Sequence, residues 1–142
     1  MIRATIDLNI IIDFLNMRQD HQQAARILDL CARREIEGLV CAHEITTLSY
    51  FLLKEQRASA KVKKVLSEIM EILTIIPVDA DVLRESLASP IRDYEDAVVE
   101  VSSKNHQADF IITRNLSDYK KSRIPAVSPI EFLEQFSQLQ RL

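Results

Sequence analysis

The stretch AARILDLCARREIEGLVC, residues 24–41, combines a helix pattern with a strand pattern. Four apolar residues recur at the spacing of one helix face, namely Ala24, Ile27, Leu28 and Cys31. Gly38 then leads into the short apolar run Leu39-Val40-Cys41, which is typical of a buried strand. The stretch therefore predicts a helix within 20–36, a turn at Gly38 and a strand at 39–41.

The same alternation of patterns continues along the rest of the chain. Short apolar runs predict further strands at 2–6, 74–78, 110–113 and 126–127. Helical spacing predicts helices at 43–52, 62–73, 79–88, 93–106 and from Ser128-Pro129 onward. Strands separated by helices need crossover connections, so we expect an α/β fold with three α/β/α layers and a central parallel sheet of four to five strands. Pro77 favours an edge position for the strand at 74–78.

Length and composition limit the class of protein. The 142 residues, 47% apolar and 27% charged, predict a single domain over 1–142. Gly38 is the only glycine, which excludes the dinucleotide fingerprint and the Walker phosphate loop. Two cysteines are too few for a four-thiolate zinc site. A net charge of −3 is unlike that of a purely electrostatic nucleic-acid binder.

Neither a membrane span nor a secretory signal is predicted. The longest apolar runs have four residues, far below the roughly 20 that cross a bilayer. The opening MIRATIDLN has no basic segment followed by an apolar stretch. We therefore expect a cytoplasmic protein.

Polar residues collect where the predicted strands end. In open parallel sheets, ligands bind beyond the carboxyl ends of the strands. The residues expected at that edge are Asp7, Asn9, Glu44, Arg114, Asn115 and Asp118, with Asp96 in the first turn of the helix before the fourth strand. Several carboxyl groups could converge there.

Converging carboxylates repel one another unless a cation or a proton intervenes. Oxygen ligands of this kind suit Mg²⁺ or Mn²⁺, which also bind substrate phosphate oxygens. The sequence therefore favours metal-assisted hydrolysis of a phosphodiester.

Each of these residues also has a structural interpretation. Asp7 could be a turn residue, and Asp93 could cap a helix with Asp96 in its first turn. Surface or capping roles suit Glu44 and Asp118 when each is taken singly. Four further expectations are structural: a surface position for His43, helix-terminal positions for His21 and His106, core positions for Cys31 and Cys41, and a turn position for Asp109.

Five segments in order resemble the PIN-domain nucleases, especially the small VapC-type toxins. They are IDLNIIIDFL with Asp7 and Asn9, AHEI with Glu44, DYEDAV with Asp96, ADFIITRN ending at Asn115, and SPIEFLEQ. The resemblance covers nearly the whole chain. It implies a PIN-like fold and a metal-dependent endoribonuclease, the toxin of a type II toxin–antitoxin pair.

The resemblance also implies the composition of the site. Asp7, Glu44 and Asp96 would hold Mg²⁺ or Mn²⁺ and carry catalysis. The family often has aspartate after Thr-Arg, where this chain has Asn115, so the fourth position falls either to Asn115 or to Asp118. A second ion is therefore in doubt. We expect supporting residues beside these ligands, namely Asn9, Asp93 and Thr113.

Partners follow from charge and from the resemblance. Four cations after the fourth strand are candidate RNA contacts, namely Arg114, Lys120, Lys121 and Arg123. The resemblance implies an antitoxin that inhibits the site. It also favours a homodimer, with Phe51 and Leu52 as candidate contacts.

Two other functions stay open. Asn115 favours a catalytically impaired PIN-like module that binds protein or RNA, whereas the three acids favour the enzyme. A phosphotransfer receiver also gathers acids at strand ends, but the chain lacks a lysine directly after a late strand.

Overall fold

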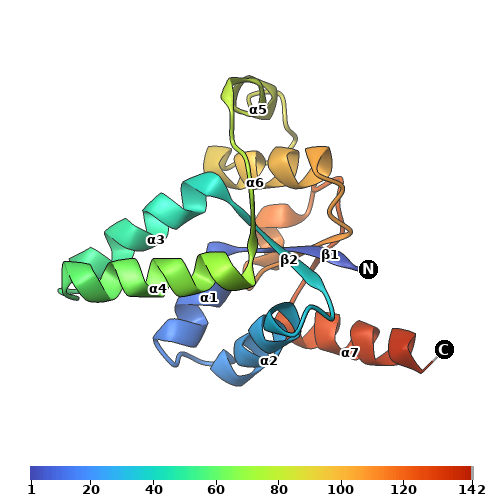
Figure 1. Ribbon diagram of the computed structural model, residues 1–142. Coiled ribbons are helices and arrows are strands. Elements are labelled where there is room, and N and C mark those ends of the chain that lie inside the picture. The colour runs from blue at the N-terminus through green and yellow to red at the C-terminus, as the bar shows by residue number, and fades with distance from the viewer. Residues whose placement is uncertain (142) are drawn as a thin grey trace.

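A parallel sheet lies at the centre of the computed structural model, which describes residues 1–141 (Figure 1). Its strands are β1 (Arg3–Ile6), β2 (Glu37–Cys41), β3 (Thr74–Ile76), β4 (Phe110–Ile112) and β5 (Ala126–Val127). They lie in the order β3-β2-β1-β4-β5, and every neighbouring pair is parallel. The predicted α/β fold with a parallel sheet is confirmed. The single-domain prediction for 1–142 extends to Leu142, which lies outside the described residues.

Helices cover both faces of the sheet (Figure 1). They are α1 (Leu8–Leu15), α2 (His21–Ala32), α3 (Ala42–Lys54), α4 (Ser59–Ile72), α5 (Ala80–Ser86), α6 (Tyr94–Asn105) and α7 (Pro129–Gln140), with a short 3₁₀ helix η1 (Leu116–Tyr119). Helix α6, with α5 beyond it, lies on one face, and α1, α2 and α7 lie on the other. Helices α3 and α4 run side by side away from the sheet.

Capping side chains begin four of these helices, and Asp79 caps α5 by accepting a hydrogen bond from the Val82 amide at 2.9 Å. Asp7 accepts a hydrogen bond from the Leu8 amide at the start of α1. Asp93 accepts from the Asp96 amide at the start of α6, as the capping interpretation predicts. Ser128 caps α7, whose first residue is proline. The sequence analysis predicted no helix at 8–15, where α1 lies, and it left the residues of η1 in a polar loop.

Gly38 lies inside β2 and not in the turn before it, so the turn prediction is wrong. A Cβ atom at Gly38 would lie 2.5 Å from Cys31 Sγ and 2.6 Å from Leu73 Cδ2. Helix α2 and the end of α4 therefore approach the strand too closely for any side chain at this position. The turn after α2 comes earlier, at residues 33–36.

The core confirms some predicted positions and corrects one. Cys31 and Cys41 are buried as free thiols, and β3 is an edge strand with Pro77 just after its end. Leu52 is fully buried inside the molecule, so it cannot be the predicted dimer contact. Phe51 is partly buried, with the Arg18 guanidinium 5.8 Å from its ring centre.

The strand order places a binding crevice at the centre of the sheet. The chain adds β2 and β3 on one side of β1, and then β4 and β5 on the other. Ligands in open α/β sheets bind at such a reversal, beyond the carboxyl ends of the strands. Here that place lies beside the ends of β1 and β4, where Asp7 and Thr113 follow.

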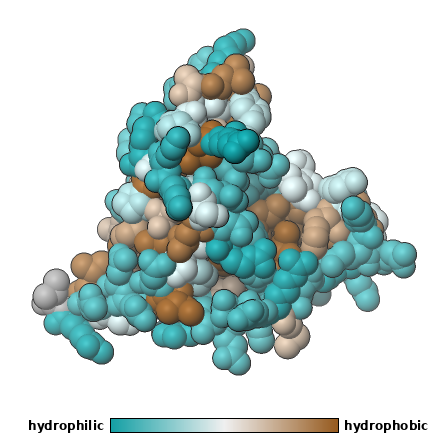
Figure 2. All heavy atoms as spheres, turned by 180° about the vertical axis from the view of Figure 1, so that it is seen from behind, coloured by the Kyte–Doolittle hydropathy of each residue, from teal (hydrophilic) through white to brown (hydrophobic). Residues whose placement is uncertain are grey.

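The molecule has a largely hydrophilic surface with separate apolar patches (Figure 2). One patch lies at the α5 end, where Leu83 and Leu87 are exposed. Among the described residues, no helix combines the length and apolar character of a membrane span.

Candidate metal centre

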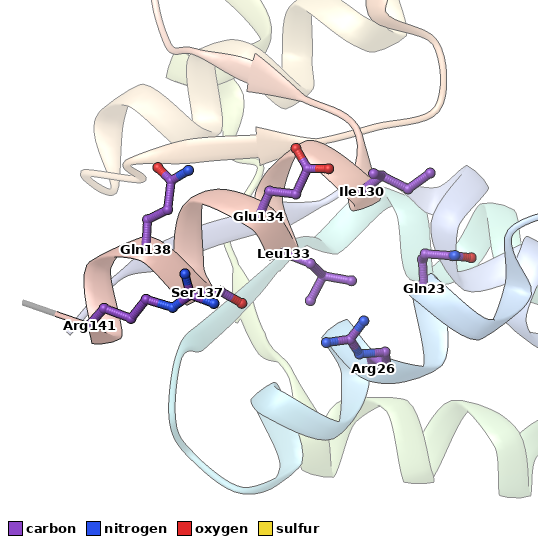
Figure 3. Close-up of a pocket in the computed structure, with 8 residues that line it drawn as sticks. All are labelled: Gln23, Arg26, Ile130, Leu133, Glu134, Ser137, Gln138 and Arg141. Atoms are coloured by element: carbon purple, nitrogen blue, oxygen red, sulfur yellow. The ribbon is translucent and has the colours of Figure 1, made fainter.

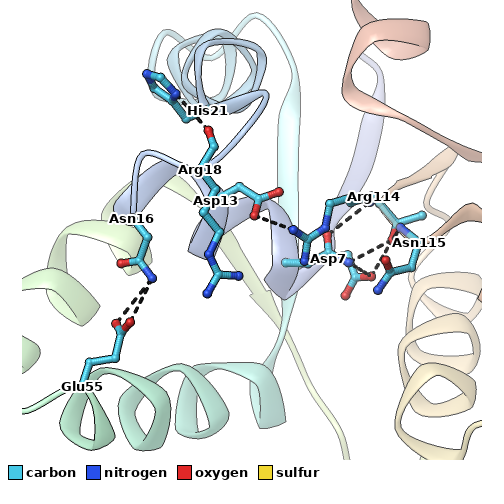
Figure 4. Close-up of polar contacts among 10 residues, drawn as sticks. Asp7, Asp13, Asn16, Arg18, His21, Glu55, Arg114 and Asn115 are labelled. Atoms are coloured by element: carbon cyan, nitrogen blue, oxygen red, sulfur yellow. Dashed lines mark hydrogen bonds and ion pairs between the residues drawn. The ribbon is translucent and has the colours of Figure 1, made fainter.

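Asp7 is fixed by contacts from both central strands and from α1 (Figure 4). It is almost fully buried at the end of β1. Its Oδ1 accepts a hydrogen bond from the Leu8 amide at 2.9 Å. Its Oδ2 accepts from Thr113 Oγ1 at 2.8 Å and from Asn9 Nδ2 at 3.2 Å. The structure thus brings Asn9 and Thr113 into direct contact with Asp7, beside the residue that the sequence analysis expected them to support.

Glu44 is a buried acid with one unpartnered oxygen. It lies in the first turn of α3 and is only 2% exposed, so the surface interpretation is wrong. Its Oε2 accepts from the Leu8 amide at 3.0 Å, while Oε1 has no hydrogen-bond partner among the described residues. Burial, followed by the nearby Asp7 carboxylate, raises the pKa of Glu44 well above its usual range.

Asp96 faces the same region from the opposite layer. Tyr119 Oη donates a hydrogen bond to Asp96 Oδ1 at 3.3 Å. Burial is the largest cause that raises the pKa of Asp96 to about 7, and the Asp7, Asp93 and Asp118 carboxylates raise it further. Asp96 is therefore only partly ionised near neutral pH unless a cation stabilises its charge.

We call Asp7, Glu44 and Asp96 the acidic centre. The Asp7 carboxylate contributes to the raised pKa of both other members, so the three groups are electrostatically coupled. Within residues 1–141, no three Asp, Glu, His or Cys side chains are grouped so that they could hold a metal ion together. Mg²⁺ usually keeps several waters and uses one or two protein carboxylates, so an open oxygen site suits it. The unpartnered Glu44 Oε1 and the oxygen-only ligands fit such a cation.

The two candidates for the fourth position lie on different sides of the acidic centre. The backbone amide of Asn115 donates a hydrogen bond to Thr113 Oγ1 at 3.0 Å. Thr113 Oγ1 in turn donates to Asp7, so Asn115 lies next to Asp7 (Figure 4). Asp118 is exposed on η1 and acts on Asp96. Either residue could contribute an oxygen ligand, so the choice between them stays a prediction.

Two of the four predicted RNA contacts are held by buried acids. Arg114 forms an ion pair at 3.0 Å with Asp13, which is 2% exposed. Arg123 forms one at 2.8 Å with Glu100, which is fully buried. In contrast, Lys120 and Lys121 are exposed, and neither forms an ion pair within the described chain.

The sequence predicted a surface position for His43, but the residue is half-buried. Both of its ring nitrogens are buried without a hydrogen-bond partner in residues 1–141. Burial lowers the pKa of His43, and the Asp7 carboxylate partly opposes this shift. The helix-terminal positions of His21 and His106 are confirmed.

Sequence reasoning missed three residues that support the site, namely Asp13, Glu100 and Tyr119. The two acids each stand alone in an apolar run, in IIIDFL and AVVEV. A single carboxyl group in such a run signals a buried residue that needs a partner. No comparable signal marks Tyr119, whose hydroxyl role depends on the fold.

A cavity of about 430 Å³ lies between α2 and α7 (Figure 3). Figure 3 shows Arg26 and Arg141 among its lining side chains. No residue of the acidic centre lines this cavity. Its position therefore does not connect it with the chemistry of the carboxylates.

Comparison with known proteins defines the class. The family model of the PIN domain matches residues 3–117, and the chain belongs to this family. No curated protein matches the chain by sequence. The fold is that of VapC-type PIN-domain proteins from toxin–antitoxin systems.

Solved structures establish this likeness of fold. VapBC2 from Rickettsia felis, bound to promoter DNA, gives a TM-score of 0.68 at 16% identity over 89% of this chain and 98% of that chain. A toxin–antitoxin complex from Klebsiella pneumoniae gives 0.66 at 22% identity, over 89% and 97%. VapC20 from Mycobacterium tuberculosis, a toxin that cleaves the sarcin–ricin loop, gives 0.58 at 13% identity, over 76% and 86%.

Proposed function

We propose that this protein is a divalent-metal-dependent endoribonuclease that acts in the cytoplasm as the toxin of a type II toxin–antitoxin pair. The observation that carries the proposal is the acidic centre itself. Asp7 after β1, Glu44 on α3 and Asp96 on α6 are electrostatically coupled beyond the carboxyl ends of the central strands, with Asp7 and Glu44 buried and Asp96 half-buried. Membership of the PIN domain family supports a nuclease rather than another use of these acids.

Each acid has a role in the proposed reaction. Asp7 and Asp96 would hold Mg²⁺ or Mn²⁺, and Glu44 would add its free oxygen directly or through a bound water. When bound, the cation would activate water and screen the charge that develops on the phosphate. Asn9 and Thr113 would keep the Asp7 carboxylate oriented through their hydrogen bonds to Oδ2.

Protein partners complete the proposal. Several structures of similar fold are toxin–antitoxin complexes, which supports an antitoxin for this chain. The arginine of an antitoxin could enter the acidic centre in place of the metal. A homodimer would use exposed apolar side chains of α3, such as Tyr50 and Leu53, and not the buried Leu52.

The second candidate is a PIN-like module without catalysis. Asn115 at the fourth position and the lack of a complete metal cage within residues 1–141 favour it. Such a module would bind RNA or protein with no need for a divalent cation.

RNA cleavage separates these two functions. With Mg²⁺ or Mn²⁺, we expect the wild type to cut single-stranded RNA, and EDTA to abolish this activity. Asp7→Asn should lower the rate by roughly 100-fold or more, because it removes a principal ionic stabiliser. Glu85→Gln removes one charge from an exposed side chain of α5 and is the matched control. Equal cleavage by wild type and Asp7→Asn would exclude the proposed site.

A further inference from the structure

A cavity of about 210 Å³ lies next to the acidic centre, between segment 90–92 and segment 117–121. Both of its walls are tied to Asp96. Segment 90–92 leads into Asp93, which accepts a hydrogen bond from the Asp96 amide at 3.0 Å. Tyr119, within the other wall segment, donates to the Asp96 carboxylate. The cavity is therefore held beside the place where the proposed reaction occurs.

The rim of this cavity carries an excess of positive charge. Arg92, Lys120 and Lys121 line it, against one carboxylate from Asp118. All three cations are exposed, and none of them forms an ion pair within the part of the chain that the structure describes. Arg114 and Arg123, in contrast, are each paired with a buried acid. The three rim cations are thus available to an anionic ligand.

Part of the lining is apolar. It contains Pro90 and Ile91, and the Ile91 side chain is anchored in the core with only 5% exposure. An apolar surface beside a cationic rim matches the two parts of a nucleotide, its base and sugar on one side and its phosphate on the other. The volume lies below the roughly 300 Å³ at which pockets for drug-sized ligands begin, so one nucleotide unit is the largest fitting ligand.

We propose that this cavity binds the nucleotide next to the scissile bond of single-stranded RNA, with Arg92, Lys120 and Lys121 holding its phosphate. The inference rests on the proposed function, because it places this nucleotide beside the metal-dependent reaction. The subsite would offset the repulsion that the acidic centre exerts on a polyanion. It would also fix which phosphodiester reaches the carboxylates.

The test compares two triple variants that change the net charge equally. The subsite variant carries Arg92→Gln, Lys120→Gln and Lys121→Gln. The control carries Lys61→Gln, Lys63→Gln and Lys64→Gln, all exposed on α4. Fluorescence anisotropy with a labelled oligouridylate in EDTA measures binding without cleavage, over a series of salt concentrations. Thermal melting by circular dichroism verifies that both variants fold.

We expect the subsite variant to bind this RNA about tenfold more weakly than the control. The slope of log K against log salt should decrease in magnitude by about 0.7, because the subsite holds one phosphate and each neutralised phosphate contributes roughly 0.7 on single strands. In cleavage assays, KM of the subsite variant should rise by a larger factor than kcat falls. A generally damaged fold would not change the salt slope selectively.

The outcomes separate the subsite from the function. If the wild type cleaves RNA but the two variants share one Kd, one slope and one KM, the subsite is wrong and the nuclease stands. The cations would then serve a protein partner. If only the subsite variant has a reduced salt slope and the wild type cuts no RNA with Mn²⁺, the proposed nuclease function is wrong and the proposed subsite stands. If the wild type binds no RNA in EDTA and cuts none with Mn²⁺, both proposals are overturned.

Discussion

At the scale of single residues, the raised pKa of Asp96 makes the stability of the folded protein depend on pH in a measurable way. The pKa of Asp96 rises from 3.8 to about 7, chiefly by burial and then by the Asp7 carboxylate. The folded state therefore holds the proton more tightly than the unfolded state. Stability from this group is complete below about pH 4 and is lost as the pH rises toward 7.

The metal-free Asp96→Asn variant should consequently be more stable than the wild type at pH 8. We expect its free energy of unfolding to exceed the wild-type value by on the order of 1 kcal/mol, after screening by solvent, with no gain at pH 4. Urea unfolding in EDTA at both pH values measures the difference. Glu85→Gln on exposed α5 is the control. A gain of the same size at pH 4 would argue against repulsion among the carboxylates.

Tyr119 acts on Asp96 through one hydroxyl group. Burial is the largest cause that raises the pKa of Tyr119, so the hydroxyl stays protonated and donates to Asp96 Oδ1. Partners of this kind orient a metal-binding carboxylate. The Tyr119→Phe change removes the donor and keeps the buried ring.

We expect Tyr119→Phe to weaken Mn²⁺ binding by roughly tenfold, the lower end of the effect of removing such a partner. Isothermal titration calorimetry measures the affinity, and thermal melting measures the fold. Tyr50→Phe, which removes an exposed hydroxyl on α3, is the matched control. Identical Mn²⁺ affinities for the two variants would show that the hydroxyl has no part in the site.

At the scale of elements, Glu100 connects α6 to the loop that follows η1. Its carboxylate accepts hydrogen bonds from the Arg123 amide at 2.7 Å, the Arg123 guanidinium at 2.8 Å and Ser89 Oγ at 2.9 Å. Burial opposes its ionisation, but these contacts outweigh burial and lower the pKa of Glu100. The stability that this contact adds is therefore present above pH 4.5 and is lost as the pH falls through the lowered value.

Glu100→Gln should reduce the free energy of unfolding at pH 7 by about 2 kcal/mol, because a buried charge-assisted contact is lost. The difference from the wild type should shrink below pH 4, where the native carboxyl group also becomes neutral. Urea unfolding across this pH range gives both values. Glu131→Gln is the control, because it removes a carboxyl group in the first turn of α7 that has no part in this contact. A pH-independent difference for Glu100→Gln would attribute the loss to packing alone.

Elements were predictable where their pattern is local. The strand at 126–127 and the helix after Ser128-Pro129 match β5 and α7, because proline and a capping serine act within a few residues. The helix predicted within 20–36 ends at Ala32, and Gly38 belongs to β2. The helix prediction is thus confirmed, whereas the position of Gly38 depends on the close approach of Cys31 and Leu73, of which Leu73 is distant in sequence.

The same distinction applies to the candidate site. Asp7 and Glu44 were predictable as strand-end residues, since parallel strands carry their carboxyl ends to one edge of the sheet. The burial of Glu44, the Asp13–Arg114 pair and the Glu100–Arg123 pair depend on long-range contacts. Asp13 and Arg114 lie 101 positions apart. Their pairing therefore had no signature in the sequence.

For the whole molecule, the positions of the acidic and basic side chains matter more than the net charge. The net charge is −3, yet the acids of the acidic centre face inward at the crevice, and the rim cations stand beside them. A bound divalent cation would neutralise the crevice and leave the rim attractive to RNA. Metal loading and RNA binding should thus reinforce each other.

A nuclease of this kind should harm a cell that lacks its inhibitor. We expect expression of the wild type, without a partner gene, to slow growth of the host, because the proposed activity would degrade RNA. Asp7→Asn at the same protein level should restore growth. Growth curves with immunoblots for protein amount give the comparison. Equal growth with both proteins would favour the non-catalytic module.

If the protein is a metal-dependent nuclease, its acidic centre holds a divalent cation. Anomalous diffraction from crystals of the wild type grown with Mn²⁺ locates that cation. We expect an anomalous peak within about 2.5 Å of carboxylate oxygens of Asp7 and Asp96, and the remaining neighbours of the peak would decide between Asn115 and Asp118. Crystals that show Mn²⁺ only elsewhere, or none at the acidic centre at millimolar Mn²⁺, would mean that these carboxylates do not form the metal site.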